Sequence, residues 1–520
     1  MAIFTSSRRH FVGGLVAAPF ILPAAGRAQL PFADYPFTLG VAAGDAQADG
    51  FVIWTRLAPD PLDPHGGMPM AEVPVDWEVA EDEHFRTIAA KGTEKAWPEL
   101  AHSVHVEVTG LKPGRPYWYR FRCAGERTFA GRATTLPAPG SRVDRVRFAA
   151  IGCQHFEAGY YTAYRHAAED APDFMFHYGD YIYEYSPGFV LDAFDRPIEA
   201  VRRYATREPF SLDDYRVRYA QTTTDADLQA ARAAAPWYCT YDDHEVQNNW
   251  VSEWAQDGTP PETFLLRRRA AFQAWYEHMP VRRSSFPDAQ GVAHMRRRVD
   301  IGDLIRLHMP NTRLYRSDQP CGDGFKPLCA EASAATQQVL GKAQESWLEE
   351  GFTSSSQHWQ GVAQQVMMAP IDRRTPDYPN AQPTYNMDSW AAYPGPRERI
   401  LALFDRHKGG NVVVVTGDEH QNWAIDLQRD GRTVASEFVS TSITSGGDGH
   451  DLRPGNEEIM RDNPFLHWTN DRRGYLLSDI TRDAWTGHFR VVDAITRRDA
   501  PIATAARWAV QSGQAGLVSA

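Results

Sequence analysis

The chain lacks the patterns that mark integral membrane proteins, nucleic-acid-binding proteins and structural zinc domains. No stretch reaches the roughly 18 apolar residues that a transmembrane helix requires. Acidic residues outnumber basic ones by 66 to 54, and the formal charge of −12 argues against a basic nucleic-acid-binding surface. Only five cysteines occur, and none forms the Cys-x-x-Cys unit of a structural zinc site. What remains is an ordinary globular composition, and 520 residues are enough for two domains.

Residues 1–28 have the pattern of an export signal. Arg8 and Arg9 precede Phe11, and an apolar stretch of small residues over 12–25 leads to a candidate cleavage site. The paired arginines predict the twin-arginine (Tat) pathway. The Tat translocase is therefore an expected partner, and the mature protein is expected to be periplasmic or secreted. An ordinary secretory signal that happens to contain two arginines is the alternative.

The five cysteines fall into three groups. Cys321 and Cys329 flank a glycine-rich loop and are candidates for a local disulfide in an oxidising compartment, although spacing alone does not fix the geometry. Cys123 and Cys239 are expected to be small buried residues. Cys153 differs, because it follows an apolar strand and is surrounded by polar residues.

Residues 33–140 predict an all-β sandwich of the fibronectin-III or immunoglobulin type. Short segments such as 51–54 and 75–79 alternate apolar and polar residues, with turn signals between them. Segment 111–121 combines a turn with a strand that begins with aromatics on alternate positions, which is typical of a tyrosine corner. Residues 134–140 predict a linker. No chemistry is evident here, so we expect a packing or lid role.

From residue 145 to about 505, strands alternate with helices, which predicts an α/β domain. Short apolar runs over 148–151, 174–177 and 411–416 predict buried strands, and 364–369 is predicted to be a further strand. Ligands bind beyond the carboxyl ends of the strands in open parallel sheets. Residues 506–520 are expected to form a C-terminal tail that covers the site.

Three strand ends carry dense polar groups: Gly179-Asp180, Asp242-Asp243-His244 and Gly417-Asp418-Glu419-His420. A single aspartate at a strand end is usually a helix N-cap, and a single buried histidine usually has only a packing role. Three such segments in one crevice are different, because like charges at about 4 Å repel unless cations separate them. Carboxylate, imidazole and amide oxygen donors suit iron, manganese, magnesium or calcium. The sequence therefore predicts a metal site.

The order of these motifs resembles that of the PhoD-type alkaline phosphatases and phosphodiesterases of the calcineurin-like metallophosphoesterase superfamily. The motifs are a Gly-Cys pair at 152–153, GDYIY at 179–183, DDHEVQNN at 242–249 and VVVVTGDEH at 412–420. The resemblance covers nearly the whole chain, including the signal and the β-sandwich. It implies a four-layer αββα catalytic domain that hydrolyses phosphomonoesters and phosphodiesters.

The resemblance also implies cofactors and roles for individual residues. One Fe(III) and one or two Ca²⁺ are expected, with Asp180 shared between iron and calcium. The implied iron ligands are Cys153, Asp180, Tyr183 and His420, and the implied calcium ligands are Asp418 and members of the pairs Asp242/Asp243 and Asn248/Asn249. Which member of each pair binds calcium stays open. The position of the usual family motif favours Asp243, and the reach of a side chain from a loop favours Asn249.

Three further residues are candidates for proton transfer or substrate binding. His244 is expected to protonate the leaving alkoxide, or else to orient a neighbouring aspartate. His155 and Arg313 are candidate substrate contacts. The alternative for His155 is that it supports a metal ligand, and the alternative for Arg313 is that it pairs with an acid in the core. Other activities weighed are a phospholipase D-like enzyme or nucleotide phosphodiesterase of the same superfamily, and, more distantly, a non-catalytic exported binding protein.

Overall fold

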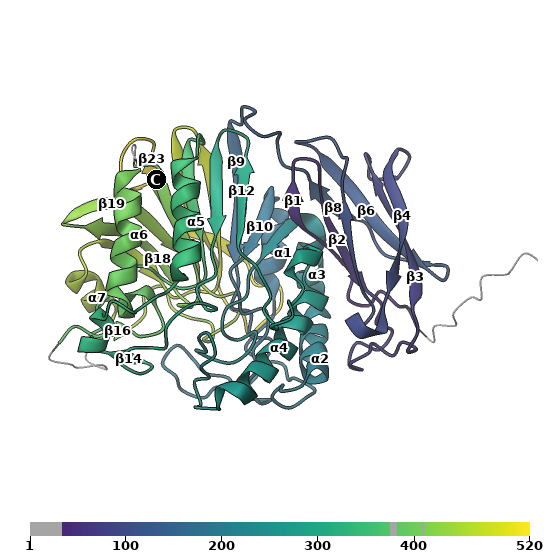
Figure 1. Ribbon diagram of the computed structural model, residues 1–520, viewed down its shortest axis with the longest axis horizontal. Helices are drawn as coiled ribbons and strands as arrows, with labels where there is room; N and C mark the ends of the chain where they lie inside the picture. The colour runs from purple at the N-terminus through teal and green to yellow at the C-terminus, as the bar shows by residue number, and fades with distance from the viewer. Residues whose placement is uncertain (1–33, 375–381, 408–409) are drawn as a thin grey trace, which may run out of the picture.

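The computed structural model describes residues 34–374, 382–407 and 410–520. Two large β-sheets pack face to face with helices on their outer surfaces, and an additional small sheet extends the molecule on the N-terminal side (Figure 1). The predicted signal lies outside the described residues. Among the helices that the structure describes, none is long and apolar enough to cross a membrane.

The first large sheet has ten strands and contains the predicted parallel core. β9 (Arg145–Ile151), β10 (Phe174–His177) and β11 (Pro236–Cys239) run parallel, and β1 (Val41–Gln47) pairs in parallel with β11. The sheet order is β24-β23-β22-β21-β9-β10-β11-β1-β2-β5. The outer strands are β2 (Gly50–Arg56), β5 (Ser103–Val108), β21 (Gly474–Thr481), β22 (Ala484–Val492), β23 (Ile502–Gln511) and β24 (Leu517–Ser519).

The second large sheet has seven strands in the order β12-β13-β15-β17-β19-β18-β20. Its strands are β12 (Arg297–Ile301), β13 (Ile305–Met309), β15 (Trp359–Ala363), β17 (Val412–Thr416), β18 (Asn422–Arg429), β19 (Arg432–Val439) and β20 (Leu466–Asn470). The predicted strand over 364–369 is wrong, because β15 ends at Ala363. The loop that follows gives its backbone N–H groups at Met368 and Ala369 to the buried carboxylate of Glu437.

Helices cover the outer faces of both large sheets (Figure 1). The helices are α1 (Thr162–Glu169), α2 (Leu212–Thr223), α3 (Ala226–Ala234), α4 (Pro261–His278), α5 (Gly341–Thr353), α6 (Pro394–Arg406) and α7 (Asn456–Asp462). Short 3-10 turns occur at Pro98–Leu100, Arg283–Ser285, Ala330–Ser333 and Trp390–Ala392. A two-stranded ribbon joins β14 (Phe325–Lys326) to β16 (Tyr385–Asn386).

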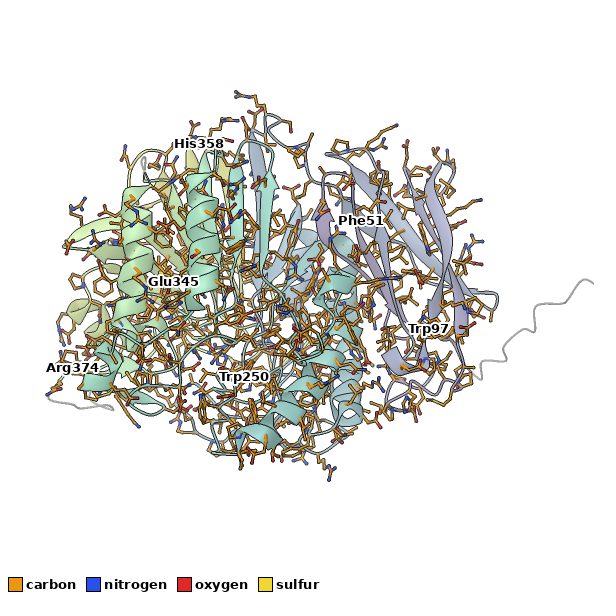
Figure 2. All side chains as sticks on the ribbon, in the orientation of Figure 1. Phe51, Trp97, Trp250, Glu345, His358 and Arg374 are labelled. Carbon is orange, nitrogen blue, oxygen red and sulfur yellow. A yellow bond between two sulfur atoms is a disulfide. The ribbon has the colours of Figure 1, made fainter. Side chains whose placement is uncertain are left out.

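Strand β17 explains why the central strands are continuously apolar. Val413 and Val415 enter the core between the two sheets, whereas Val412 and Val414 pack with α5 and α6. Because side chains alternate across a strand, a strand that is covered on both faces needs apolar residues at every position. Side chains fill the space between the layers throughout (Figure 2). The predicted four-layer αββα fold is confirmed.

The N-terminal sandwich shares a sheet with the catalytic domain. One layer contains β3 (Val73–Ala80), β4 (Ile88–Ala96), β6 (Pro116–Cys123), β7 (Glu126–Arg127) and β8 (Gly131–Thr134). The other layer is formed by β1, β2 and β5 of the ten-stranded sheet. The tyrosine corner is confirmed, because the Tyr117 hydroxyl accepts a hydrogen bond of 2.9 Å from the backbone N–H of Lys112.

The predicted C-terminal tail is wrong. Residues 506–520 complete β23 and add β24 at the edge of the ten-stranded sheet, and none of them lines the cleft described below. β23 alternates between partly buried and exposed positions in its first half. β23 is paired on both sides, with β22 and with β24, and Gly513 and Gly516 lie in the turn between β23 and β24 instead of in a covering tail.

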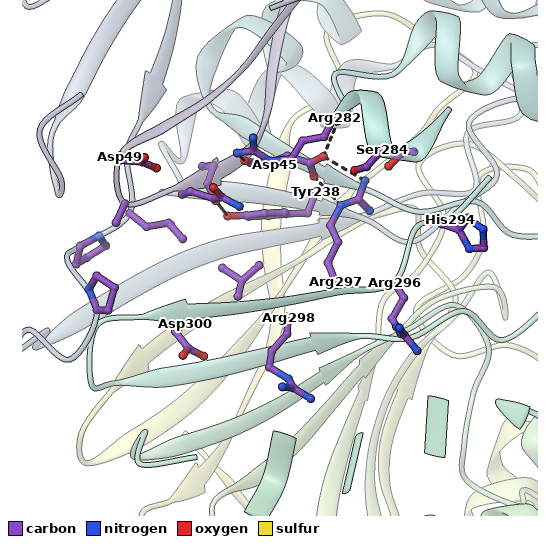
Figure 3. Close-up of a pocket in the computed structure, with 18 residues that line it drawn as sticks. Asp45, Asp49, Tyr238, Arg282, Ser284, His294, Arg296, Arg297, Arg298 and Asp300 are labelled. Atoms are coloured by element: carbon purple, nitrogen blue, oxygen red, sulfur yellow. Dashed lines mark hydrogen bonds and ion pairs between the residues drawn. The ribbon is translucent and has the colours of Figure 1, made fainter. Parts of the chain in front are cut away.

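A cavity of about 690 Å³ lies where the sandwich, the linker and β12 meet (Figure 3). Several arginines line it, and three of them, Arg282, Arg297 and Arg298, already have acidic partners. Arg297 pairs with Asp45 at 2.7 Å, and Arg282 pairs with Glu107 at 3.0 Å. The pairs with Asp45 and Glu107 connect β12 and the segment before it to the sandwich, which identifies this region as a junction between domains.

Candidate metal centre

The predicted metal-binding residues lie at sharp turns that follow the strands. Cys153, Asp180, Asn249, Asp418 and His420 all have φ between 50° and 70°, in the left-handed region. Non-glycine residues adopt this conformation at some energetic cost, and such residues cluster at functional sites. Cys153, Asp180 and Asp418 come two or three residues after the ends of β9, β10 and β17, so these turns carry polar side chains just beyond the strands.

The four predicted iron ligands converge. The Cys153 sulfur, a carboxylate oxygen of Asp180 and a ring nitrogen of His420 all lie within 4.8 Å of one another. The Tyr183 hydroxyl is 3.1 Å from His420 Nε2 and 3.2 Å from Asp180 Oδ2. Ser445 donates a hydrogen bond of 2.7 Å to the same Tyr183 oxygen. A thiol, a carboxylate, a phenol and an imidazole therefore surround one point.

A second group contains four aspartates. Carboxylate oxygens of Asp180, Asp242, Asp243 and Asp418 lie within 4.8 Å of one another, and these side chains are buried or nearly so. Burial and repulsion from the neighbouring aspartates raise the pKa values of Asp180 and Asp418 well above their usual range. The group is therefore costly to ionise without a cation, and Asp180 belongs to both groups.

Arg313 is the counter-charge inside this acidic group. Its side chain is fully buried, and its Nε lies 2.5 Å from Asp242 while its Nη1 lies 2.6 Å from Asp388. Burial raises the pKa of Asp242 to about 6, although Arg313 partly offsets this shift. For Asp243, Arg313 and His244 outweigh the effect of burial and lower the pKa. Arg313 is absent from the cleft lining, so its contacts are with core acids.

His244 forms a buried pair with Glu184. Its Nδ1 lies 2.7 Å from Glu184 Oε2, and Glu184 Oε1 accepts a hydrogen bond from the Asn248 backbone. Burial opposes protonation of the imidazole, but Asp243 and Glu184 outweigh it and raise the pKa of His244 to about 9. The bond to Nδ1 directs Nε2 away from Glu184, and His244 lines the cleft.

His155 lies behind the first group rather than in the cleft. Its ring stacks on the Tyr183 ring with centroids 4.6 Å apart, and it is absent from the cleft lining. Burial lowers the pKa of His155 well below its usual range, so the ring is neutral. His155 therefore packs against a predicted ligand.

The two asparagines after the second strand differ in their contacts. The side chain of Asn248 accepts a hydrogen bond from Tyr185 and donates one to Gln256. Asn249 instead donates its backbone N–H to Asp243 Oδ2 at 2.7 Å, and its side-chain amide donates to Asp323. Asn249 is thus bonded directly to the acidic group, and Asn248 is not.

A cleft of about 310 Å³ opens above both groups. Asp180, Asp243, Asp418 and His420 line it, together with His244. Cys153, Tyr183 and Asp242 are buried and do not line it. Trp250, labelled in Figure 2, is fully buried and donates its indole N–H to the backbone oxygen of Asp243.

Sequence reasoning missed three acidic residues that support the site. Glu245 is fully buried and accepts hydrogen bonds of 2.7–2.9 Å from the backbone N–H groups of Asp180, Tyr181 and Asp242. Glu184 and Asp388 hold His244 and Arg313. Glu184 and Glu245 stand inside or next to the motifs quoted above, but only the fold shows which backbone groups they bind.

The donor set fits a metal centre. The thiol of Cys153, the phenol of Tyr183 and the imidazole of His420 are present on one side, and four carboxylates are present on the other, with the His244 imidazole beside Asp180 and Asp243. Thiolate, imidazole and phenolate suit iron, and carboxylate and amide oxygens suit calcium. Bound cations would also remove the repulsion among the four aspartates, which Arg313 cannot balance and His244 balances only in part because it is paired with Glu184.

Comparison with known proteins identifies the family. The family model described as PhoD-like phosphatase matches residues 148–489, and the model of its N-terminal domain matches residues 23–137. Alkaline phosphatase D from Bacillus subtilis is 46% identical over 491 residues, covering 94% of this chain and 82% of the relative.

Solved structures agree. The structure of PhoD superposes with a TM-score of 0.90 at 46% identity and covers 94% of this chain and 93% of that one. A purple acid phosphatase from yellow lupin shares the fold, with a TM-score of 0.54, 13% identity and coverage of 92% and 74%. These matches do not favour the alternative activities. The chain therefore belongs to the PhoD-like phosphatase family and hydrolyses phosphate esters.

Proposed function

We propose that this phosphatase is exported by the Tat pathway and uses one Fe(III) and one or two Ca²⁺ to hydrolyse phosphomonoesters and phosphodiesters. The observation that carries the proposal is the position of Asp180, which belongs both to the group with Cys153 and His420 and to the group of four aspartates. A carboxylate shared by two donor groups of different chemistry suits a pair of unlike metal ions.

Cys153, Asp180, Tyr183 and His420 would hold iron. Asp180, Asp243, Asn249 and Asp418 would hold calcium, and Asp242 would contribute while paired with Arg313. Bound metals would activate a water molecule and neutralise charge on the phosphate oxygens. The chain's own contribution is to fix these donors, because Glu245 ties together the turns that carry Asp180 and Asp242.

His244 supplies the proton for the leaving alkoxide. Glu184 holds its Nδ1, Asp243 and Glu184 together favour the protonated ring, and His244 lines the cleft. We expect His244→Gln to lower kcat by about 10²–10³ for alkyl phosphates, within the usual range for a general acid. The loss should be much smaller for p-nitrophenyl phosphate, whose leaving group needs no proton. Equal losses on both substrates would assign His244 to orienting Asp243 instead.

His155 and Arg313 act through other residues in this proposal. His155 supports the Tyr183 ring, and Arg313 holds Asp242 and Asp388, so both are positioning residues. The observation behind this revision is that neither side chain lines the cleft.

The test begins with protein exported through a working Tat pathway. We would measure metal content and visible absorbance together with hydrolysis of p-nitrophenyl phosphate and bis(p-nitrophenyl) phosphate. Iron plus calcium, an absorption band from a phenolate–iron pair and loss of turnover after chelation are expected. The ratio of the two rates ranks monoesters against diesters. A Cys153→Ala variant that keeps full iron and full activity would overturn the thiolate assignment, and Arg8→Lys/Arg9→Lys protein that is still exported would overturn the Tat assignment.

A further inference from the structure

A disulfide closes a loop at the rim of the cleft. Cys321 and Cys329 are bonded, as the sequence suggested, with their Cα atoms 5.7 Å apart. The loop between them contains β14, and its residues Gly324 and Phe325 line the cleft. An exposed surface loop of this length has little packing of its own, so the cross-link restricts its conformations.

Asp323 in this loop faces back toward the site. The glycines on either side have φ of +75° and +87°, a left-handed conformation that allows the chain to turn sharply at Asp323. Both carboxylate oxygens of Asp323 accept hydrogen bonds from the side-chain nitrogen of Asn249, at 2.8 and 3.0 Å. Fixing the amide nitrogen in this way directs the amide oxygen to the opposite side, away from Asp323.

Neighbouring contacts connect the same segment to the core of the site. The Gln319 side-chain amide donates to the Asn249 backbone oxygen at 2.9 Å and to Asp388 Oδ1 at 2.8 Å. Asp388 in turn pairs with Arg313. The chain just before and inside the disulfide loop thus contacts both a predicted calcium ligand and the arginine network.

We propose that Asp323 is a positioning residue for calcium binding, held in place by the disulfide-closed loop at 321–329. This role of Asp323 rests on the proposed function of Asn249 as a calcium ligand. Asp323 keeps the Asn249 amide in the orientation that presents its oxygen to the ion, and the disulfide keeps Asp323 in reach. Partners that orient a metal ligand typically contribute 10- to 100-fold to metal affinity.

The test measures the affinity of the full-length protein for Ca²⁺ by calorimetry. We expect Asp323→Ala to weaken Ca²⁺ binding about 10- to 100-fold, and Asp323→Asn, which retains one acceptor, to recover part of the loss. The Cys321→Ser/Cys329→Ser double variant should show a similar loss, and adding Asp323→Ala to it should change little further, because both act through one contact. Glu331→Ala is the control, since it removes an exposed acid just beyond the loop.

Asn249→Ala separates the possible failures. If it weakens Ca²⁺ binding while Asp323→Ala binds as the parent protein does, the role of Asp323 is overturned and the ligand assignment stands. If Asn249→Ala binds Ca²⁺ normally, the ligand assignment is wrong and the inference falls with it. A lower melting temperature in Asp323→Ala with unchanged Ca²⁺ affinity would mean that Asp323 has only a structural role.

Discussion

Two buried clusters of charge show how this fold distinguishes structure from function. At the junction between the sandwich and the catalytic domain, Arg216 forms two bonds of 2.7 Å with Glu277. Arg56 lies beside it and bonds to His278 and to the backbone oxygen of Ala101. Asp213 lies 3.5 Å from Arg216 as well, so two arginines face two carboxylates and this cluster is balanced without a ligand.

In the group of four aspartates at the strand ends, the negative charges outnumber the cations. Four aspartates lie within 4.8 Å of one another, and Arg313 is the cation bonded among them. Burial raises the pKa values of Asp180 and Asp418, whereas the junction acid Glu277 has its guanidinium partner. Two clusters of similar burial therefore differ in charge balance, and the unbalanced one belongs to the site. The predictions below test this contrast, beginning with the largest effect.

Asp180→Asn should abolish activity while making the metal-free protein more stable. Loss of the shared carboxylate should lower kcat/KM by at least about 10³-fold, or about 4 kcal/mol. The neutral amide also removes repulsion with Asp242 and Asp243, so the melting temperature in chelator should rise at pH 8. Calorimetry with and without chelator measures both effects. An unchanged or lower melting temperature would contradict the imbalance.

Arg313→Met should destabilise the metal-free protein by about 3–5 kcal/mol, because it leaves buried aspartates without their internal cation. Added Ca²⁺ should reduce this loss, since the ion supplies the missing charge. Arg399→Met is the matched control: its pair with Glu345 is near the surface and should contribute less than about 1 kcal/mol. Chemical denaturation in chelator compares the two. Equal effects would show that Arg313 is an ordinary ion-pair partner.

His105 should make the junction sensitive to acid. It is buried between the backbone oxygens of Tyr276 and Met279, and burial lowers its pKa to about 4. The folded state therefore holds the neutral ring, so its contribution is complete above pH 6.5 and is lost as the pH falls toward 4. The loss should reach about 3 kcal/mol. Melting temperatures of the parent protein and His105→Gln across this range check it, and parallel curves would contradict it.

Glu277→Gln should have the smallest effect and should leave catalysis intact. Arg216 keeps its bond to the Glu99 backbone oxygen, so we expect a loss of about 2 kcal/mol in stability. The values of kcat/KM and metal content should equal those of the parent protein. A drop in metal content would show that the junction and the site are coupled.

The sequence was sufficient for the central strands and for the residues at their ends. β9, β10, β11 and β17 are short apolar runs because both faces are covered, and that pattern is local. Donors follow these strands within a few residues, as expected at the carboxyl ends of parallel strands. They come from two different sheets, because β17 belongs to the seven-stranded sheet, so their meeting also depends on how the two sheets pack.

Contacts between distant segments could not be predicted in the same way. Glu184 and His244 are 60 residues apart, and Arg313 and Asp242 are 71 apart. Charged residues of this kind are equally common on solvated surfaces, so nothing local marks them as partners. For the same reason the sequence did not predict that the sandwich and the catalytic domain share a sheet. The pairing of β1 with β11 joins residues about 190 positions apart along the chain.

The most direct measurement is the metal content and Ca²⁺ affinity of three proteins prepared alike: the parent, Asp180→Asn and Glu277→Gln. If charge imbalance marks the metal site, the parent and Glu277→Gln will contain the same iron and bind Ca²⁺ equally, and Asp180→Asn will lose both. Normal iron and Ca²⁺ in Asp180→Asn would show that the shared carboxylate does not hold the metals.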